Sequence, residues 1–188
     1  MSVKEAIQAR RAYRSLESVE ITQSLVQDLA EQSALAPSCY NKQPWRFVFA
    51  YDGQVLEQLF DAISTGNDWA RQASLVVAVF SGKELDCVVK EREYYLFDTG
   101  MAVGFLMLRA TELGLVAHPI AGFDEEKVKE ILNIPVDMRL ITLLIVGKKS
   151  AGISPLLNEK FVASEKQRPP RMEFEQFSFI DSYREPGK

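Results

Sequence analysis

The chain has 188 residues, of which 47% are hydrophobic and 26% are charged, as is typical of one globular domain with a full hydrophobic core. The formal net charge of −4 gives no overall attraction to nucleic acid or to an anionic membrane, so a phosphate would need a local basic cluster. The longest uncharged apolar stretch in the middle of the chain, residues 100–108, has nine residues, whereas a membrane span needs roughly 20. No hydrophobic signal-peptide segment opens the chain, and we expect a cytoplasmic protein.

The first half of the chain is predicted to contain helix 3–11, helix 22–35, loop 37–44, strand 45–51 and helix 53–64. Thr22 is a suitable N-cap for the second helix. Pro37 ends that helix and opens a loop that is rich in turn-forming residues. The strand is dense in aromatic and β-branched side chains.

The second half is predicted to contain strand 74–80, helix 91–113, strand 115–120, helix 124–134 and strand 139–146. The first and last of these strands are continuously apolar, which suits strands that are buried on both faces. Residues 100–108 are apolar on every side of their helix, so we expect them to be covered on every side. Either the rest of this chain or a second subunit could cover them.

Residues 148–188 have only patchy periodicity and are predicted to form an extended tail. Disordered segments are poor in aromatic residues, whereas this tail has five, so we expect it to be ordered by lying on another surface. Those residues are Phe161, Phe174, Phe177, Phe179 and Tyr183. Strands that interleave with helices indicate an α/β or α+β sandwich. We expect a core at residues 1–150 and a C-terminal arm of the same domain at residues 151–188.

Two basic segments could contact an anion. Arg10, Arg11 and Arg14 place three guanidinium groups within five residues. Such groups suit phosphate oxygens, but cations at a helix C-terminus also complement its dipole. Lys166 and Arg168 would lie on one side of an extended chain, where a solvated surface is the default interpretation.

Two loop segments could approach a ligand. Residues 37–45 offer hydroxyl, amide and backbone donors between two prolines, although a plain helix-to-strand connection explains them equally simply. In residues 119–124, Gly122 would let the backbone come close to a ligand, and Asp124 is a natural N-cap. The chain has no GxGxxG or Walker motif. Cys39 and Cys87 are not in a CxxC pair, which argues against a zinc site and leaves a disulfide open.

In this order along the chain, the four segments resemble the motifs of the FMN-dependent nitroreductase family. The resemblance rests on Arg10-Arg11-x-x-Arg14, Pro37-Ser38-Cys39-x-Asn41-x-Gln43-Pro44-Trp45, Pro119-Ile120-Ala121-Gly122-Phe123-Asp124 and Lys166-x-Arg168. It implies an α+β sandwich with a central, mostly antiparallel sheet flanked by helices. It also implies a homodimer with FMN at the subunit interface and a C-terminal tail that extends onto the partner.

The resemblance also implies roles for individual residues. Arg10 and Arg168 would hold the FMN phosphate, and Arg14 would lie near the pyrimidine edge of the flavin. The backbone around Ala121 and Gly122 would face flavin N5. The remaining cofactor contacts that it implies are Arg11, Ala12, Pro37, Ser38, Cys39, Asn41, Gln43, Asn67, Pro119, Ile120 and Lys166, of which Ser38, Asn41 and Gln43 would come from the partner subunit.

The sequence departs from the family pattern at several positions. Ala12 stands where the family often has serine, and Ala121 stands where some members have glutamate. We interpret Cys39, where a second serine is common, as a small polar filler and not as a redox thiol. His118, the only histidine, is a structural residue or a substrate contact, with the structural role favoured. Packing is also favoured for Trp69, Tyr94, Tyr95 and Phe97.

By this resemblance the chain is an NAD(P)H oxidoreductase that takes electrons from NADH or NADPH. It would pass them through FMN to a nitroaromatic, quinone or related acceptor by ping-pong hydride transfer. No catalytic side chain and no metal is expected, because flavin N5 carries the chemistry. Two alternatives remain, which are a non-catalytic FMN-binding protein that acts as a flavin store or sensor and a flavin-free dimeric interaction protein.

Overall fold

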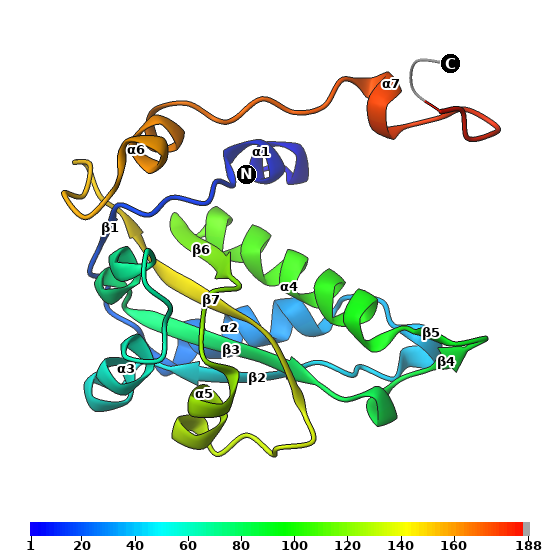
Figure 1. Ribbon diagram of the computed structural model, residues 1–188, viewed down its shortest axis with the longest axis horizontal. Helices are drawn as coiled ribbons and strands as arrows, with labels where there is room; N and C mark the ends of the chain where they lie inside the picture. Colours follow the sequence, from blue (N-terminus) through cyan, green and yellow to red (C-terminus); the bar gives the residue numbers. More distant parts are fainter. Residues whose placement is uncertain (186–188) are drawn as a thin grey trace.

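The computed structural model describes residues 1–185, and it is built around an antiparallel sheet (Figure 1). Strand β7 (Arg139–Lys149) pairs with β3 (Leu75–Ser81), β6 (Leu115–Ile120) and β1 (Leu16–Glu17), and β2 (Arg46–Ala50) pairs with the far side of β3. Each of these pairings is antiparallel. The chain is therefore an α+β sandwich with an antiparallel central sheet, as expected.

Helices cover both faces of the sheet. Helices α2 (Gln23–Ala34) and α4 (Tyr95–Glu112) lie on one face, and α3 (Gly53–Phe60) and α5 (Glu125–Leu132) lie on the other (Figure 1). Successive residues of β3 contribute alternately to the two cores, because neighbouring side chains of a strand point to opposite faces. This double burial explains why β3 and β7 are continuously apolar although the sheet is antiparallel.

Most predicted boundaries are close to the observed ones. Thr22 caps α2 by accepting a hydrogen bond from the Leu25 N–H, and Asp124 caps α5 in the same way. Gly114 follows α4 with φ +78°, a conformation that favours glycine. Short 3₁₀ turns lie between the longer elements: η1 (Cys39–Asn41), η2 (Asp68–Gln72) and η3 (Lys83–Leu85).

Three predicted helices are shorter in the structure. The helix expected at residues 91–113 begins at Tyr95, because the preceding residues form a hairpin of β4 (Val88–Val89) and β5 (Arg92–Glu93). Helix α3 ends at Phe60 instead of residue 64. The first helix, α1 (Val3–Ala9), ends before the arginines expected in its last turn.

The C-terminal arm is not continuously extended as expected. Helix α6 (Glu159–Lys166) is capped by Asn158, and a short helix α7 (Phe174–Phe177) follows. Beyond α6 the arm runs away from the body of the molecule (Figure 1). Its large apolar side chains there are exposed, namely Met172, Phe174, Phe177, Ile180 and Tyr183. The last three residues of the expected arm lie outside the described part of the chain.

One side of α4 remains uncovered in the single chain. Val103, Leu106 and Ala110 are buried against the sheet, but Phe97 is 64% exposed and Phe105 is 42% exposed. The rest of this chain therefore does not surround the apolar segment 100–108. No helix within residues 1–185 is long and apolar enough to cross a membrane.

Candidate functional site

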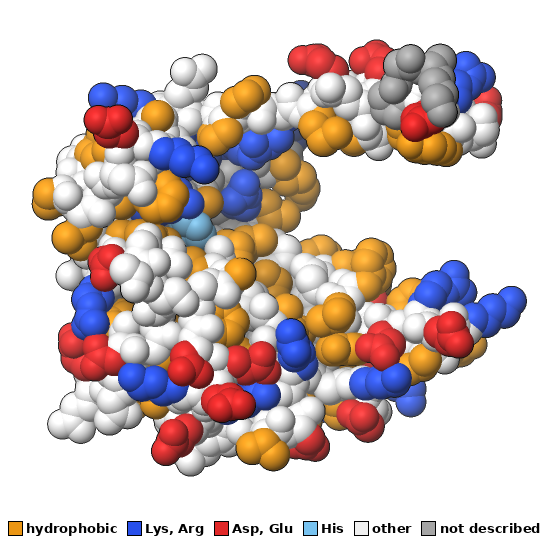
Figure 2. All heavy atoms as spheres, viewed as in Figure 1, with side chains coloured by type: hydrophobic (Ala, Val, Ile, Leu, Met, Phe, Trp, Pro, Cys, Tyr) orange, Lys and Arg blue, Asp and Glu red, His pale blue; other side chains and the backbone are white. Residues whose placement is uncertain are grey.

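A cleft of about 690 Å³ opens between the segment after α1 and helix α6. Its size lies within the range of small-molecule and cofactor sites. Lys and Arg side chains gather at the inner end of the hollow between the arm and the body (Figure 2). The lining residues come from two separate parts of the sequence: Arg10, Arg11, Ala12, Arg14, Lys160, Phe161, Ala163, Ser164, Gln167, Arg168, Pro169, Pro170 and Arg171.

The cleft has an uncompensated positive charge. Burial, and then the neighbouring Arg168 and Arg171, lower the pKa of Arg10. None of the salt bridges found within residues 1–185 includes Arg10, Arg168 or Arg171. Like charges that are held together disfavour the charged form of each group. A bound anion would relieve this repulsion, and phosphate is the anion that guanidinium groups match in geometry.

Two of the arginines also dock the arm onto the body. Arg168 Nη2 donates to the backbone oxygens of Gln8 and Arg10, at 2.6 and 2.8 Å. Arg11 Nη2 donates to the backbone oxygens of Ser164 and Glu165. Arg11 therefore holds the C-terminal end of α6, whose last carbonyls lack partners within the helix.

Arg14 lies deeper, at the junction of the cleft with the sheet. Its guanidinium carbon is 4.0 Å from the centre of the Phe161 ring and 5.7 Å from that of Trp69. Burial lowers the pKa of Arg14, and the nearby Glu165 partly offsets this effect. Arg14 Nε is buried without a hydrogen-bond partner among the described residues. A buried donor of this kind is costly unless a ligand or water accepts from it.

Glu165 fixes the backbone that carries Arg14. Only 8% of this residue is exposed, and its carboxylate accepts from the N–H groups of Arg14 at 2.7 Å and Ser15 at 3.3 Å. A buried acid of α6 thus anchors the N-terminal segment, while Arg11 of that segment anchors α6. The two sides of the cleft are held together by these reciprocal contacts.

The segment after β6 meets Asn67 beside Trp69. A Cβ atom on Gly122 would lie 2.8 Å from Asn67 Nδ2, so a larger residue here would displace the Asn67 side chain. Asn67 Oδ1 accepts from Trp69 Nε1 at 3.3 Å. Ala121 is exposed at the end of β6, whereas Ile120 is buried and its oxygen accepts from the Thr142 hydroxyl.

His118 has a structural role here. It is 6% exposed, and its ring stacks on that of Trp69 with 4.6 Å between the ring centroids. Its Nδ1 is 3.0 Å from the backbone oxygen of Tyr13. Burial lowers the pKa of His118 to about 4, so the ring is neutral at pH 7 and adds no charge beside Arg14.

The loop at residues 37–44 lies apart from the cleft, and none of its residues lines it. It sits at the start of α4, where Asp98 Oδ2 accepts from the Cys39 N–H at 2.6 Å. Within one chain the structure thus brings the two basic segments together and connects Arg14 with the segment after β6 through Trp69. It does not bring Pro37, Ser38, Cys39, Asn41 or Gln43 to them.

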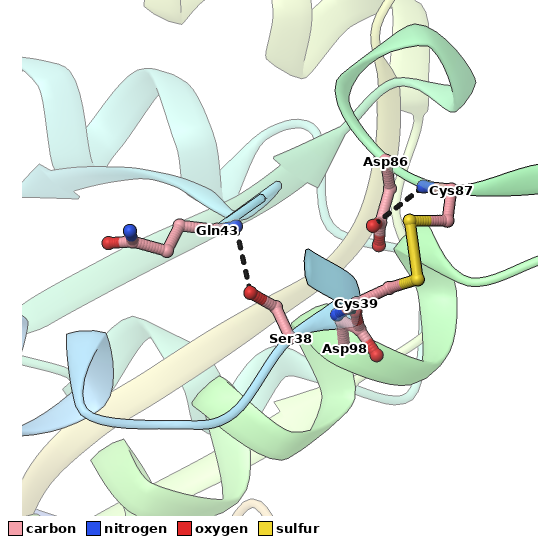
Figure 3. The surroundings of a disulfide bond; sticks show 6 residues. All are labelled: Ser38, Cys39, Gln43, Asp86, Cys87 and Asp98. Atoms are coloured by element: carbon pink, nitrogen blue, oxygen red, sulfur yellow. Dashed lines mark hydrogen bonds between the residues drawn. A yellow bond between two sulfur atoms is a disulfide. The ribbon is translucent and has the colours of Figure 1, made fainter. Parts of the chain in front are cut away.

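Two interpretations from the sequence are wrong. Cys39 is not a free polar filler, because it forms a disulfide with Cys87 (Figure 3). Lys166 and Arg168 do not share one side of an extended chain, because Lys166 is the last residue of α6. Lys166 is exposed and lies outside the cleft lining.

Sequence reasoning missed two cleft residues that carry much of its chemistry. Phe161 was assigned only to a packing surface, whereas its ring lies against the Arg14 guanidinium. Arg171 adds a charge next to Arg10. The Pro169-Pro170 pair before Arg171 was an available signal, because consecutive prolines stiffen a chain and restrict where the next residue lies.

The model of the family described as "Nitroreductase family" matches residues 7–88 and 66–148. The chain belongs to the nitroreductase family. An oxygen-insensitive NADPH nitroreductase of Helicobacter acinonychis is 26% identical over 181 residues, covering 78% of this chain and 81% of that protein. An NADH dehydrogenase of Thermus thermophilus is 25% identical over 178 residues, covering 78% and 86%.

The fold of this nitroreductase-family chain is also shared with solved structures. An oxidoreductase described as containing FMN superposes with a TM-score of 0.83 at 24% identity, covering 98% of this chain and 94% of that one. At this identity the likeness establishes the fold. The family and its relatives' names together indicate a general oxidoreductase.

Proposed function

We propose that this nitroreductase-family protein is an FMN-dependent NAD(P)H oxidoreductase whose acceptors are nitroaromatic, quinone or related compounds. The observation that carries the proposal is a group of arginines without salt bridges in a cleft that Arg14 also lines. Contacts through Trp69 and Asn67 connect Arg14 with Gly122. Relatives named as an NADPH nitroreductase and an NADH dehydrogenase support the electron donor. A structural neighbour described as containing FMN supports the cofactor.

The residues of the cleft fit FMN. Arg10 and Arg168, with Arg171 beside them, would hold the phosphate. Arg14 would stabilise negative charge on the pyrimidine edge, since its guanidinium is positioned by Phe161 and Trp69 before any ligand binds. The backbone at Ala121 and Gly122 would lie against the ring. Bound FMN would supply two-electron chemistry at N5, and the protein would orient donor and acceptor in turn.

We further propose that two chains share each site. The loop with Ser38, Asn41 and Gln43 lies away from its own cleft, with Asn41 and Gln43 exposed and Ser38 half-buried, so a partner subunit would supply it. Apolar side chains stand exposed on α1, α4 and the arm. Exposed patches of this kind mark protein–protein interfaces. In this arrangement residues 1–150 form the core and residues 151–188 the arm, whose exposed part at residues 172–185 would lie on the partner.

Removing the arm beyond Arg171 should weaken the dimer and leave the cleft lining intact. The truncation deletes exposed Phe174, Phe177 and Tyr183, whose burial on a partner would each contribute about 1.5–3 kcal/mol. We expect a dimer dissociation constant at least on the order of tenfold higher, measured by sedimentation. A full-length variant in which these three residues are replaced by serine should behave like the truncation. Unchanged association of both variants would contradict the arm's role.

Anaerobic spectroscopy tests the function directly. The purified protein should be yellow, NADH or NADPH should bleach its blue absorbance band, and menadione or a nitroarene should restore the band. A yellow protein that neither nucleotide bleaches would be a flavin store or sensor instead. A protein that does not bind added FMN would rule out both functions.

A further inference from the structure

The Cys39–Cys87 disulfide joins two surface segments that are 48 residues apart in sequence. Cys39 lies in the loop at residues 37–44, and Cys87 directly precedes the β4–β5 hairpin. Both cysteines are partly exposed, so a small thiol or a redox protein can reach them. Disulfides that are buried in a core lack this access.

The loop that holds Cys39 is strained. Tyr40, Asn41 and Gln43 have φ values of +49°, +56° and +50°, a region that residues other than glycine adopt at a cost. Such conformations persist only where the surrounding structure imposes them. The three side chains are exposed, with Tyr40 at 89%, so packing within this chain does not impose the conformation.

Hydrogen bonds and the disulfide restrain this loop, and the N–H groups of Asn41 and Lys42 donate within it to the oxygens of Ser38 and Cys39. Gln43 N–H donates to Ser38 Oγ at 2.9 Å, and Cys39 N–H donates to the buried Asp98 carboxylate at 2.6 Å (Figure 3). The disulfide is the only covalent restraint on the loop among residues 1–185 besides the chain itself. Breaking it would leave the left-handed residues held by hydrogen bonds alone.

One hydrogen bond would still position Cys39 after reduction. The Cys39 N–H donates to Asp98 of α4, and this bond does not depend on the sulfur–sulfur bond. The Cys87 N–H donates to Asp86 Oδ1 at 2.7 Å (Figure 3), a local bond that ties Cys87 to no other element. Cys39 would therefore stay at the start of α4, where Cys87 can meet it again when the hairpin segment returns.

We propose that the Cys39–Cys87 pair is a reversible redox latch that controls the shape of the loop at residues 37–44 and thereby the affinity for FMN. The effect on FMN rests on the proposed function, in which this loop contacts the flavin. An external dithiol would supply two electrons and two protons: the disulfide breaks into two thiols while the dithiol becomes a disulfide. Oxidation would hold the loop ready for binding, and reduction would release it.

Thiol labelling and FMN titration of the full chain test the latch. Protein purified without reductant should take up no alkylating reagent after denaturation, and two equivalents after dithiothreitol treatment. Reduction should weaken FMN binding about tenfold, the free-energy scale of one strained backbone residue. The Cys87→Ser variant alters no residue of the loop and should match the reduced protein, with no response to dithiothreitol. Val88→Thr, at an exposed position of the β4–β5 hairpin next to Cys87, keeps both cysteines and every residue of the loop and should still respond.

The latch can fail separately from the proposed function. Free thiols in untreated protein, or a Cys87→Ser variant with the FMN affinity of the oxidised parent, would overturn the latch while FMN binding stands. If no form binds FMN, hydrogen exchange tests whether the disulfide controls the shape of the loop. Reduction should then speed exchange in residues 37–44 and 87–94, and unchanged exchange there would overturn the latch as well.

Discussion

Replacing Arg10 by alanine should weaken FMN binding by about 10- to 100-fold, the expected loss for one charge-assisted hydrogen bond of about 1.5–3 kcal/mol. Arg10 is half-buried, and the neighbouring Arg168 and Arg171 add positive charge around it. Removing one cation relieves repulsion in the empty cleft and weakens attraction for phosphate in the filled one. The apoprotein should therefore be no less stable than the parent, while the affinity falls.

Fluorescence titration of FMN at fixed ionic strength measures this loss. Riboflavin, which lacks the phosphate, should bind the parent and the Arg10→Ala variant almost equally. Arg139→Ala is the matched control, because Arg139 is an exposed arginine outside the cleft lining and should leave both affinities unchanged. If FMN binds the Arg10→Ala variant as tightly as the parent, phosphate is held elsewhere.

Acidification below pH 6.5 should destabilise the protein through His118. Burial holds the pKa of this residue at about 4, against an ordinary value of 6.5. Between these two values the unfolded chain takes up a proton that the folded chain does not, so the free energy of unfolding falls as the pH falls. Each pH unit costs about 1.4 kcal/mol, and the full effect is on the order of 3 kcal/mol.

The groups around His118 add to this effect or oppose it. Arg14 and Arg10 disfavour a second positive charge there, whereas the carboxylate of Glu165 favours it. Urea unfolding at pH 7 and at pH 4.5 measures the loss. The His118→Asn variant places an amide N–H donor near the position of Nδ1, facing the Tyr13 oxygen, and cannot titrate, so it should lose less stability over this range. Equal losses in parent and variant would show that His118 titrates normally in the folded protein.

Most of the helices and strands of residues 1–150 followed from local patterns. Continuous apolar runs predicted β3 and β7, and Thr22 and Asp124 predicted helix starts that the structure confirms. The start of α4 was placed too early, because the left-handed turn at Lys90 and Glu91 has no glycine to mark it. Helix α6 was not predicted although Asn158 is a suitable N-cap, because its one buried residue, Glu165, is a charged residue whose partners lie some 150 positions away.

Sequence alone determined the fold class and the family, because periodicity, caps and motifs are local properties of the chain. Tertiary structure decided which of the candidate residues meet. It placed Arg10 and Arg168 in one cleft, left the loop at residues 37–44 outside that cleft, and joined Cys39 to Cys87. These outcomes depend on contacts between segments that are distant in sequence. Such contacts form only when the sheet and its helices have brought the segments together, which offsets the entropic cost of closing the long loops between them.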